Sequence, residues 1–538
     1  MTALAEIDTT NLLTVLGVLA AVGALISPTS KLQLRFCLTR LDWALGIAIL
    51  LLIHYLVFAP VLVELGIYYS FGPWRWGLSS SSAVYLLLLV GAVYFIWRTR
   101  SPALVPSKLQ IFRELVENFA FTKRYVELVS HVEPHLPKLI RMTQEEGRLV
   151  NWIDRINHVP LDPKKFILGE KEPEPSAWRR RLANALGLLR LWALRQDRPR
   201  TQAREVIRTL ITSPELTRYV AVSHPYYCIK LLDSDDALMS DFIDECVDAM
   251  LDAPGSRLYV ELKNNRNLKR GSRLALPDEN RLLRYFFANA AKAARSGVDH
   301  AIGESLLRRL NEDSRLAAKL NEPLNSYADQ GKFRCPINSG ITMFEIMVHE
   351  GLHQGVQDHM WLHYFSHFAR AITKQMAPPN PDLEYLEWPT PLHYLLSRLV
   401  SIALDWVTQP RHVDGSEFPK DSESGSGFDR LYISKEASKC LGEMLQVIML
   451  CTNISDKFKH YLFEQVIRDH NKLQADSDLA ELAKVLRVAV IFGKDWPTSP
   501  EYRTEISAQY QQLDYHVKEK AALFGQDLQY AYAESLKV

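Results

Sequence analysis

The sequence is poor in cysteine: six of its 538 residues are cysteines, and no two of them form a CxxC pair. They are scattered along the chain, at Cys37, Cys228, Cys246, Cys335, Cys440 and Cys451. This pattern argues against a disulfide-stabilised scaffold and against a zinc site built on thiolates. Buried free thiols in a reducing compartment are the simplest interpretation.

An excess of charge of one sign is also lacking, because 63 basic and 62 acidic residues leave a formal net charge of +1. Nothing in this balance indicates specific nucleic-acid binding, and a hydrophobic content of 47% excludes wholesale disorder. The chain contains no GxxxxGKS/T, GxGxxG or GxSxG pattern, no EF-hand loop and no repeat of fixed period. These absences argue against the most familiar nucleotide-binding, serine-hydrolase and calcium-sensor families.

Three hydrophobic runs without Lys, Arg, Asp or Glu lie near the N-terminus, at about residues 9–27, 44–63 and 79–97. Each is about 19–20 residues long, the length at which a helix crosses the hydrocarbon core of a bilayer. The first run follows Glu6 and Asp8 rather than a basic region, so it does not resemble a signal peptide. We expect residues 1–100 to form a membrane anchor of three transmembrane helices in the lipid bilayer.

Basic residues are distributed unequally around these runs. The first loop carries Lys31, Arg35 and Arg40, the second only Arg75, and Arg98 follows the third run. The positive-inside rule then places the N-terminus outside and the C-terminal body in the cytoplasm, at the inner membrane if the source is bacterial. Small residues four apart in the first run permit close packing, within the bundle or between the protomers of a homo-oligomer.

Most of the chain beyond residue 100 has helical periodicity. The clearest ranges are 235–252, 278–296, 302–320, 436–452, 476–492 and 502–532. We expect an α-rich domain at 105–376 that carries the motif described below, and a C-terminal helical domain at 392–538, separated by the proline-rich residues 378–391. One strand signal, 258–262 with 273–276 as its partner, predicts a small β-hairpin. The expected fold class is therefore mainly α: three N-terminal transmembrane helices, then a large α-rich cytosolic body with a small β-hairpin.

Residues 177–204 contain eight arginines and a single acidic residue, Asp197. A helix would gather large apolar side chains on one face, as helices at anionic membrane surfaces do: Trp178, Leu182, Leu186, Leu189 and Trp192. The alternative is an ordinary amphipathic helix packed on the body. Contact between 177–204 and anionic lipid therefore remains one of two interpretations.

One short motif carries chemistry: His349, Glu350, Gly351, Leu352 and His353 match HExxH. Histidines four apart on a helix share a face, so both imidazoles can reach one Zn²⁺. The glutamate beside the first histidine can act as general base on a water whose pKa the cation lowers. The motif predicts zinc as cofactor, His349 and His353 as ligands, and Glu350 as the catalytic residue.

In this segment the sequence resembles the zincin metallopeptidases. His349, His353 and His359 stand at offsets 0, 4 and 10, similar to the metzincin pattern HExxHxxGxxH, in which a glycine lets the chain leave the helix. Gly355 stands one position earlier here than in that pattern. The resemblance implies His359 as the third metal ligand; in the gluzincin alternative a downstream glutamate, Glu384 or Glu387, takes that place.

A continuous helix is the competing interpretation of the same segment. If one helix runs from Thr342 to Ala371, His359 is rotated by about 80° from His349 and lies about 15 Å further along the axis. The histidines would then be polar members of a packed helix. Whether Gly355 breaks the helix decides between the two interpretations.

Two functions are consistent with these features. The first is a membrane-anchored, cytosol-facing zinc metallohydrolase, most simply a peptidase. The second is a non-catalytic membrane-anchored helical scaffold, sensor or effector, for example in bacterial stress or phage-defence signalling, which could act as an oligomer. A weaker third interpretation makes the three hydrophobic helices part of an oligomeric channel.

Overall fold

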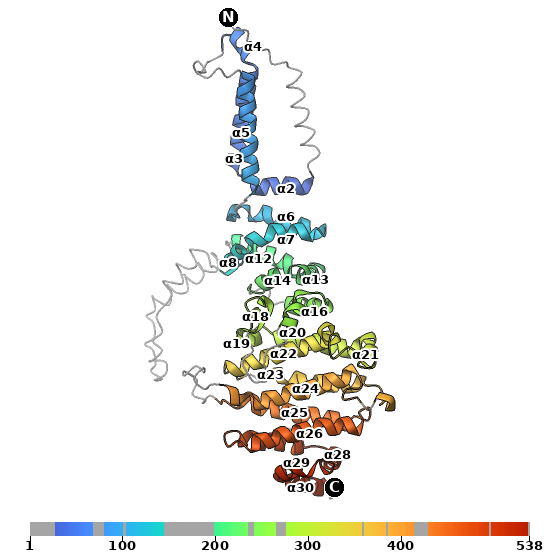
Figure 1. The fold of residues 1–538 in the computed structure, drawn as a ribbon. Helices are drawn as coiled ribbons and strands as arrows, with labels where there is room; N and C mark the ends of the chain where they lie inside the picture. Colours follow the sequence, from blue (N-terminus) through green and yellow to red (C-terminus); the bar gives the residue numbers. More distant parts are fainter. Residues whose placement is uncertain are drawn as a thin grey trace, which may run out of the picture. The chain divides into compact units, whose positions relative to one another are not determined.

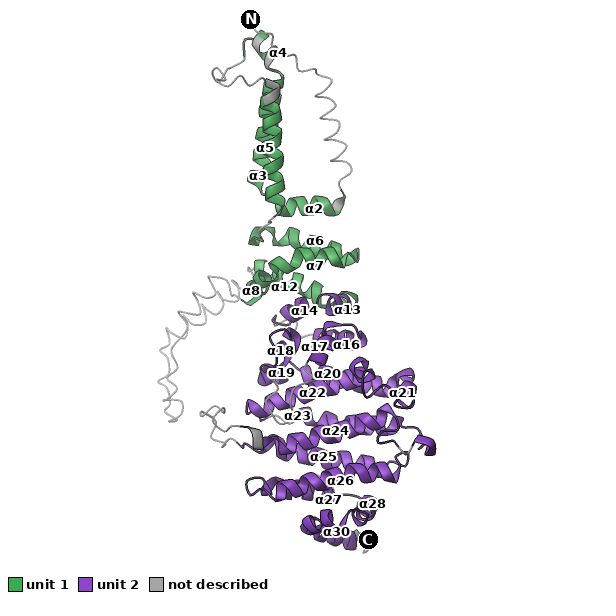
Figure 2. Cartoon of the chain, viewed as in Figure 1, with its two compact units in different colours: residues 1–216, 234–236 green, residues 217–233, 237–538 purple. Residues whose placement is uncertain are grey.

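A computed structural model describes residues 27–67, 80–100, 104–144, 198–234, 241–264, 276–357, 360–383, 386–413, 429–493 and 497–535. Every regular element within these residues is a helix (Figure 1). Contacts divide the chain into two compact units, residues 1–216 with 234–236 and residues 217–233 with 237–538 (Figure 2). The mainly α fold is confirmed. No observation tests the domain limits expected at 376 and 392, so these limits stay predictions.

The first unit contains eight described α-helices. They are α2 (Pro28–Cys37), α3 (Arg40–Val57), α4 (Ala59–Glu64), α5 (Ser80–Arg100), α6 (Leu109–Phe121), α7 (Tyr125–Val132), α8 (Leu136–Gln144) and α12 (Arg198–Ile211). Helix α3 packs against α5, while α6 contacts α2, α7 and α12. The unit therefore combines a long helical pair with a cluster of amphipathic helices.

Helices α3 and α5 turn large apolar side chains outward. On α3, Leu41 and Leu51 are 81% and 64% exposed, and on α5 Trp97 is 67% exposed. In an ordinary globular protein such side chains would be covered, and a contiguous exposed apolar face marks an interaction or membrane site. The pair therefore exposes apolar side chains of the kind found at interaction or membrane sites.

The expected set of three spans needs correction. Only α3 among the described helices is long and apolar enough to cross a membrane, with a mean hydropathy of 1.7. The range 44–63 is divided at Phe58, because Pro60 in α4 cannot continue the α3 hydrogen bonds. The range 79–97 falls on α5, whose apolar part, Ala83–Thr99, is shorter. The range 9–27 lies outside the described residues, apart from Ser27.

A buried carboxylate joins α3 to α5. Thr39 caps α3, and its side chain and backbone exchange hydrogen bonds with Asp42. The other Asp42 oxygen accepts a hydrogen bond from the Tyr94 hydroxyl at 2.5 Å, and Arg98 donates to the carboxylate at 3.2 Å. Asp42 is therefore both part of the helix cap and the polar link between the two apolar helices.

The second unit contains most of the described helices. They are α14 (Pro225–Leu231), α16 (Phe242–Asp252), α17 (Arg257–Asn264), α18 (Arg281–Phe287), α19 (Ala290–Arg295), α20 (Val298–Glu312), α21 (Ser314–Leu320), α22 (Pro336–His353), α23 (Met360–Gln375), α24 (Pro391–Thr408), α25 (Tyr432–Leu450), α26 (Asp456–Gln474), α27 (Ala480–Phe492), α28 (Pro500–Gln511), α29 (Tyr515–Lys520) and α30 (Ala522–Ser535). Helix α13 (Pro214–Ser223) contains the division between the units.

Successive helices of the second unit stack in layers, as Figure 2 shows for α22 to α27. Helix α25 lies at the centre and packs against α23, α24 and α27. Gly442 permits the closest of these approaches, because a Cβ atom there would lie 2.5 Å from the Ala489 carbonyl oxygen. Aromatic side chains fill the layers between helices, with the Phe365 and Trp406 ring centroids 4.4 Å apart.

The predicted β-hairpin is wrong. Its first strand, 258–262, lies within helix α17, and no strand occurs among the described residues. Leu258 and Leu262 are buried while Val260 is 42% exposed, which is the helical period rather than the alternation of a strand. The buried Glu261 carboxylate accepts hydrogen bonds from the backbone N–H groups of Leu282 and Leu283, at 2.9 and 3.2 Å. Packing against α18 thus overrides the local strand preference.

Three of the helices expected from periodicity are divided: 502–532 becomes α28, α29 and α30, and two others are each divided in two. The range 278–296 becomes α18 and α19, separated where Asn289 caps the second helix by accepting from the Lys292 N–H. The range 302–320 becomes α20 and α21, with Asp313 capping α21 in the same way. In both ranges the apolar period is correct, and an internal capping side chain ends the first helix.

Candidate metal centre at the end of helix α22

The HExxH residues occupy the last turn and a half of α22. Pro336 begins this helix, a position at which the missing N–H of proline is tolerated. Nearly every residue from Ile337 to His353 is buried, because α22 contacts α20, α24 and several shorter helices. The apolar run before the motif therefore seats the helix in the core, as expected for a buried metal-bearing helix.

All three chemically active side chains of the motif are buried. His349, Glu350 and His353 retain only 5%, 3% and 5% of their accessible surface. Burial lowers the pKa of His349 to about 4, with an opposing contribution from Glu345 and a reinforcing one from His353. At neutral pH His349 is uncharged, the form in which imidazole binds a metal.

His349 also has an unsatisfied polar atom. Its Nδ1 is buried and has no hydrogen-bond partner, which is uncommon for a buried ring nitrogen. His353 stands one helical turn further along, and its Nε2 lies 3.5 Å from the Gln409 amide nitrogen. Two imidazoles on one face, one of them with an orphaned nitrogen, fit the donor set that zinc prefers.

Glu350 is held by the residue that follows the motif. The Gln354 amide donates to Glu350 at 3.0 Å and to the Ala288 carbonyl at 3.1 Å, and its oxygen accepts from the Ala290 N–H at 2.9 Å. Gln354 thereby fixes the Glu350 carboxylate against the junction of α18 and α19. A carboxylate fixed in this way is oriented, as a general base must be.

Helix α22 ends directly after the motif. Gly355 has a φ of +66°, the Gly355 N–H bonds to the Leu352 carbonyl at 3.3 Å, and the Val356 N–H bonds to the Gly351 carbonyl at 2.9 Å. This pair of bonds around a left-handed glycine is a Schellman motif. The continuous helix from Thr342 to Ala371 is therefore wrong, since α23 begins afresh at Met360.

The third ligand stays a prediction. His359 and Glu384 lie outside the described residues. Glu387 is described, and it accepts a hydrogen bond from the Tyr461 hydroxyl of α26 at 2.8 Å. Within the described ranges no group of three or more His, Cys, Asp or Glu side chains is placed to hold a metal ion. His349, His353 and the adjacent Glu350 are the part of the site that the structure brings together.

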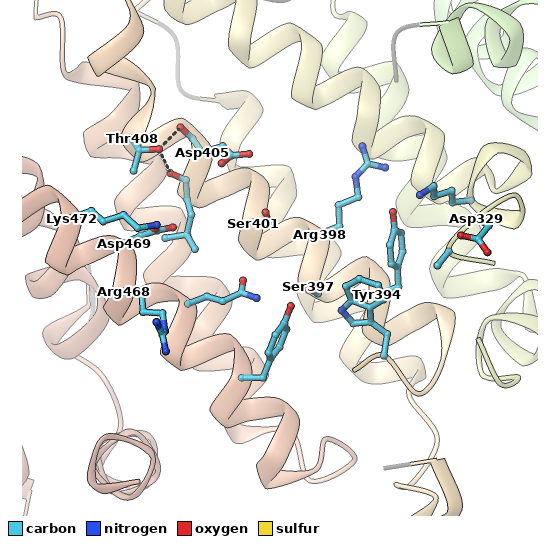
Figure 3. Close-up of a pocket in the computed structure, with 16 residues that line it drawn as sticks. Asp329, Tyr394, Ser397, Arg398, Ser401, Asp405, Thr408, Arg468, Asp469 and Lys472 are labelled. Atoms are coloured by element: carbon cyan, nitrogen blue, oxygen red, sulfur yellow. Dashed lines mark hydrogen bonds and ion pairs between the residues drawn. The ribbon is translucent and has the colours of Figure 1, made fainter. Parts of the chain in front are cut away.

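Sequence reasoning missed a second feature, a pocket of about 820 Å³ between α24 and α26. We call it the polar seam. Two rows of side chains at helical spacing form its walls: Tyr394, Ser397, Arg398, Ser401, Leu404, Asp405 and Thr408 of α24, and Tyr461, Gln465, Arg468, Asp469 and Lys472 of α26. Figure 3 shows Tyr394 and Asp329 toward one end and Thr408 and Lys472 toward the other. Polar residues three or four apart in an otherwise apolar α24 were the available signal.

Arg398 joins the polar seam to the motif helix. Its guanidinium donates to Asn338, to Thr342 at 2.8 Å and to Glu345 at 2.7 Å, all on α22. Glu345 stands four residues, about one helical turn, before His349. The two regions therefore share one charged side chain.

Comparison with family models, with curated proteins and with solved structures gives no match to this chain.

Proposed function

We propose that this protein is a membrane-anchored, cytosol-facing zinc metallohydrolase that acts on peptides. The observation that carries the proposal is the end of α22 at Gly355, directly after two buried histidines one turn apart. A chain that leaves the helix there can return a third ligand to His349 and His353, whereas a continuous helix could not. His359 is our first choice for that ligand, and Glu384 is the alternative.

The roles of the residues follow from their positions. His349 and His353 would hold the metal through neutral imidazoles, and burial already keeps His349 neutral. A zinc ion at this place would supply Lewis-acid chemistry and lower the pKa of a water toward neutrality. The Glu350 carboxylate, oriented by Gln354, would accept the proton from that water and pass it to the leaving group.

The anchor determines where this chemistry takes place. We propose that α3, paired with α5, inserts into the bilayer with the body on the cytosolic side, supported by the length and hydropathy of α3 and by the exposed apolar side chains of both helices. Contact of 177–204 with anionic lipid is part of this proposal, although 177–197 lie outside the described residues. Resistance to extraction from membranes by alkaline carbonate tests the anchor independently of the metal.

Zinc content of the full chain, purified in detergent micelles, tests the metal site. We expect about one zinc per chain by mass spectrometry, and loss of that zinc in both His349→Ala and His353→Ala. The exposed His367 of α23 is the matched control, and His367→Ala should keep its zinc. A folded, metal-free wild type would refute the site. Comparing His359→Ala with Glu384→Ala identifies the third ligand.

Glu350→Gln separates binding from catalysis. This variant should retain zinc and lose at least about a hundredfold in peptide hydrolysis, the factor typical of a missing general base. Unchanged hydrolysis in Glu350→Gln would contradict the catalytic role while leaving the metal site standing.

One observation favours a second candidate, the non-catalytic membrane-anchored scaffold. His349, Glu350 and His353 are at most 5% exposed, and the pocket of about 820 Å³ lies at the polar seam rather than beside them. In a scaffold, the motif would stabilise the core, with or without metal. Glu350→Gln would then leave every function of the protein intact.

A further inference from the structure

The polar seam is an unusual contact between two packed helices. Helices α24 and α26 contact each other, yet the facing sides carry serine, threonine, glutamine and charged residues around about 820 Å³ of open volume. Packed helices ordinarily fill such a space with interdigitating apolar side chains. The volume lies within the range of small-molecule binding sites. A polar, unfilled interface is therefore better explained by a ligand than by packing.

One end of the polar seam is aromatic. The Trp388 and Tyr394 rings meet edge to face with centroids 5.3 Å apart, and Tyr461 lines the same pocket. The Trp388 indole nitrogen is buried and has no hydrogen-bond acceptor among the described residues. Lys332 lies over the Tyr394 ring, 5.7 Å from its centroid. This end offers aromatic surfaces and an unused N–H donor, which suit a planar ring that bears acceptor atoms.

The other end is charged. Arg468 and Lys472 are one turn apart on α26, with side chains 55% and 64% exposed. Arg468 bonds Glu464 through Nε and Nη2, which leaves Nη1 for a ligand. Asp405 and Asp469 line the same end (Figure 3), and Lys472 donates to Asp469. This ion pair, beside a second carboxylate and the Arg468 guanidinium, suits a phosphate chain bound with Mg²⁺, because phosphate oxygens can replace Asp469 at Lys472 and the carboxylates can then offer oxygen ligands to the ion.

Hydroxyl and amide groups lie between the two ends. Ser397 and Ser401 of α24 and Gln465 of α26 line the middle of the pocket. Tyr394 and Thr408 are separated by about 21 Å along α24 at 1.5 Å per residue, so the ligand is elongated. A ring, a hydroxyl-bearing middle and a phosphate chain, in that order, describe a nucleoside polyphosphate. We propose that the polar seam binds a nucleoside triphosphate as its magnesium complex.

Calorimetric titration of the full chain in detergent micelles tests this proposal. The probes are ATP, GTP, CTP and UTP with Mg²⁺, and adenosine and tripolyphosphate as the two halves of the ligand. At least one triphosphate should bind, and each half should bind at least about tenfold more weakly, because each occupies only one end. Tripolyphosphate binding as tightly as every nucleotide would overturn the proposal in favour of a simple anion site.

Two variants locate the binding. Ser401→Trp places an indole in the middle of the pocket and should abolish nucleotide binding. Arg468→Ala, at an exposed position, should weaken triphosphate binding about tenfold, the contribution of one charge-assisted hydrogen bond, and leave adenosine unchanged. The exposed Arg370 of α23 is the matched control. Nucleotide binding that is equal in the wild type, Ser401→Trp and Arg468→Ala would place the site elsewhere and refute the proposal.

Nucleotide binding at the polar seam is measured independently of zinc binding at the metal centre. Zinc binding is measured at His349 and His353, neither of which lines the polar seam. A chain that binds nucleotide without zinc, or zinc without nucleotide, therefore supports one proposal and rejects the other.

Discussion

Polar side chains are buried at the end of α22, whereas they line an open pocket in the polar seam. At the end of α22, His349, Glu350 and His353 are enclosed by neighbouring helices and a Schellman turn. Along α24 and α26, polar side chains surround open volume that no residue of the described chain fills. Burial makes a titratable group sensitive to its immediate neighbours, whereas an open polar surface is ready for an external partner. A recognisable motif and an accessible pocket are thus separate properties of this chain.

Arg398, the residue shared by both regions, should give the largest effect. Its side chain and that of Glu345 are 19% and 26% exposed, so Arg398→Leu leaves a largely buried carboxylate without its cation. We expect a loss of about 3 kcal/mol in the free energy of unfolding, measured by urea denaturation with tryptophan fluorescence.

The matched control is Arg124→Leu. Its ion pair with Glu127 joins side chains that are 42% and 41% exposed, and its loss should change stability by about 0.5 kcal/mol or less. Adding Glu345→Gln to Arg398→Leu should recover part of the loss. If both arginine variants lose the same free energy of unfolding, the contacts of Arg398 with α22 contribute no more to stability than an exposed ion pair does.

Buried histidines on the two seam helices predict acid sensitivity. Burial lowers the pKa of His393 and of His470 to about 4, against an ordinary value of about 6.5. The unfolded chain binds more protons between these values, so stability is complete above about pH 6.5 and declines as the pH falls toward 4. Each histidine should contribute about 2 kcal/mol of lost stability between pH 7 and pH 5.

Substitution tests the assignment of this pH dependence. His393→Gln and His470→Gln should each flatten the decline in stability between pH 7 and pH 5, while the exposed His367→Gln should leave it unchanged. A decline of the same steepness in all three variants would assign the acid sensitivity to other groups.

Gly355 should give the smallest effect. Gly355→Ala places a side chain at a φ of +66°, and we expect it to destabilise the protein by about 1 kcal/mol in the same denaturation experiment. Gly255 is the control, because a Cβ atom added there would have no neighbour within 4 Å and its φ is not positive. If Gly355→Ala and Gly255→Ala lower the free energy of unfolding equally, the left-handed turn is not what ends α22.

Local patterns predicted the helices, and long-range contacts explain most of the errors. The apolar periods of α25 and α27 are visible in the sequence because one face of each helix is buried. The strand expected at 258–262 failed because Glu261 bonds backbone groups of α18, more than twenty residues away. No local preference contains that contact. The division of 44–63 at Phe58 was visible in principle, since Pro60 stands inside the range.

The two candidate sites also differ in how far a local sequence pattern predicts them. HExxH is a five-residue pattern, and its spacing alone places His349 and His353 on one helical face. The polar seam joins residues of α24 and α26 that are about sixty positions apart, so only the packing of the two helices brings them together. Glycine adopts positive and negative φ about equally readily, so the sequence alone does not predict whether Gly355 ends the helix. Contacts in the folded protein determine its φ of +66°.

The hydrogen bonds of Glu261 also bear on the order in which the chain folds. Helix α18 has seven residues, too few to persist alone, and its Asn280 N-cap makes no side-chain bond to the helix. In its first turn, the N–H groups of Leu282 and Leu283 donate to the Glu261 carboxylate of α17. The two helices should therefore form one cooperative folding unit, in which amides of α18 exchange with solvent no more slowly than those of α17.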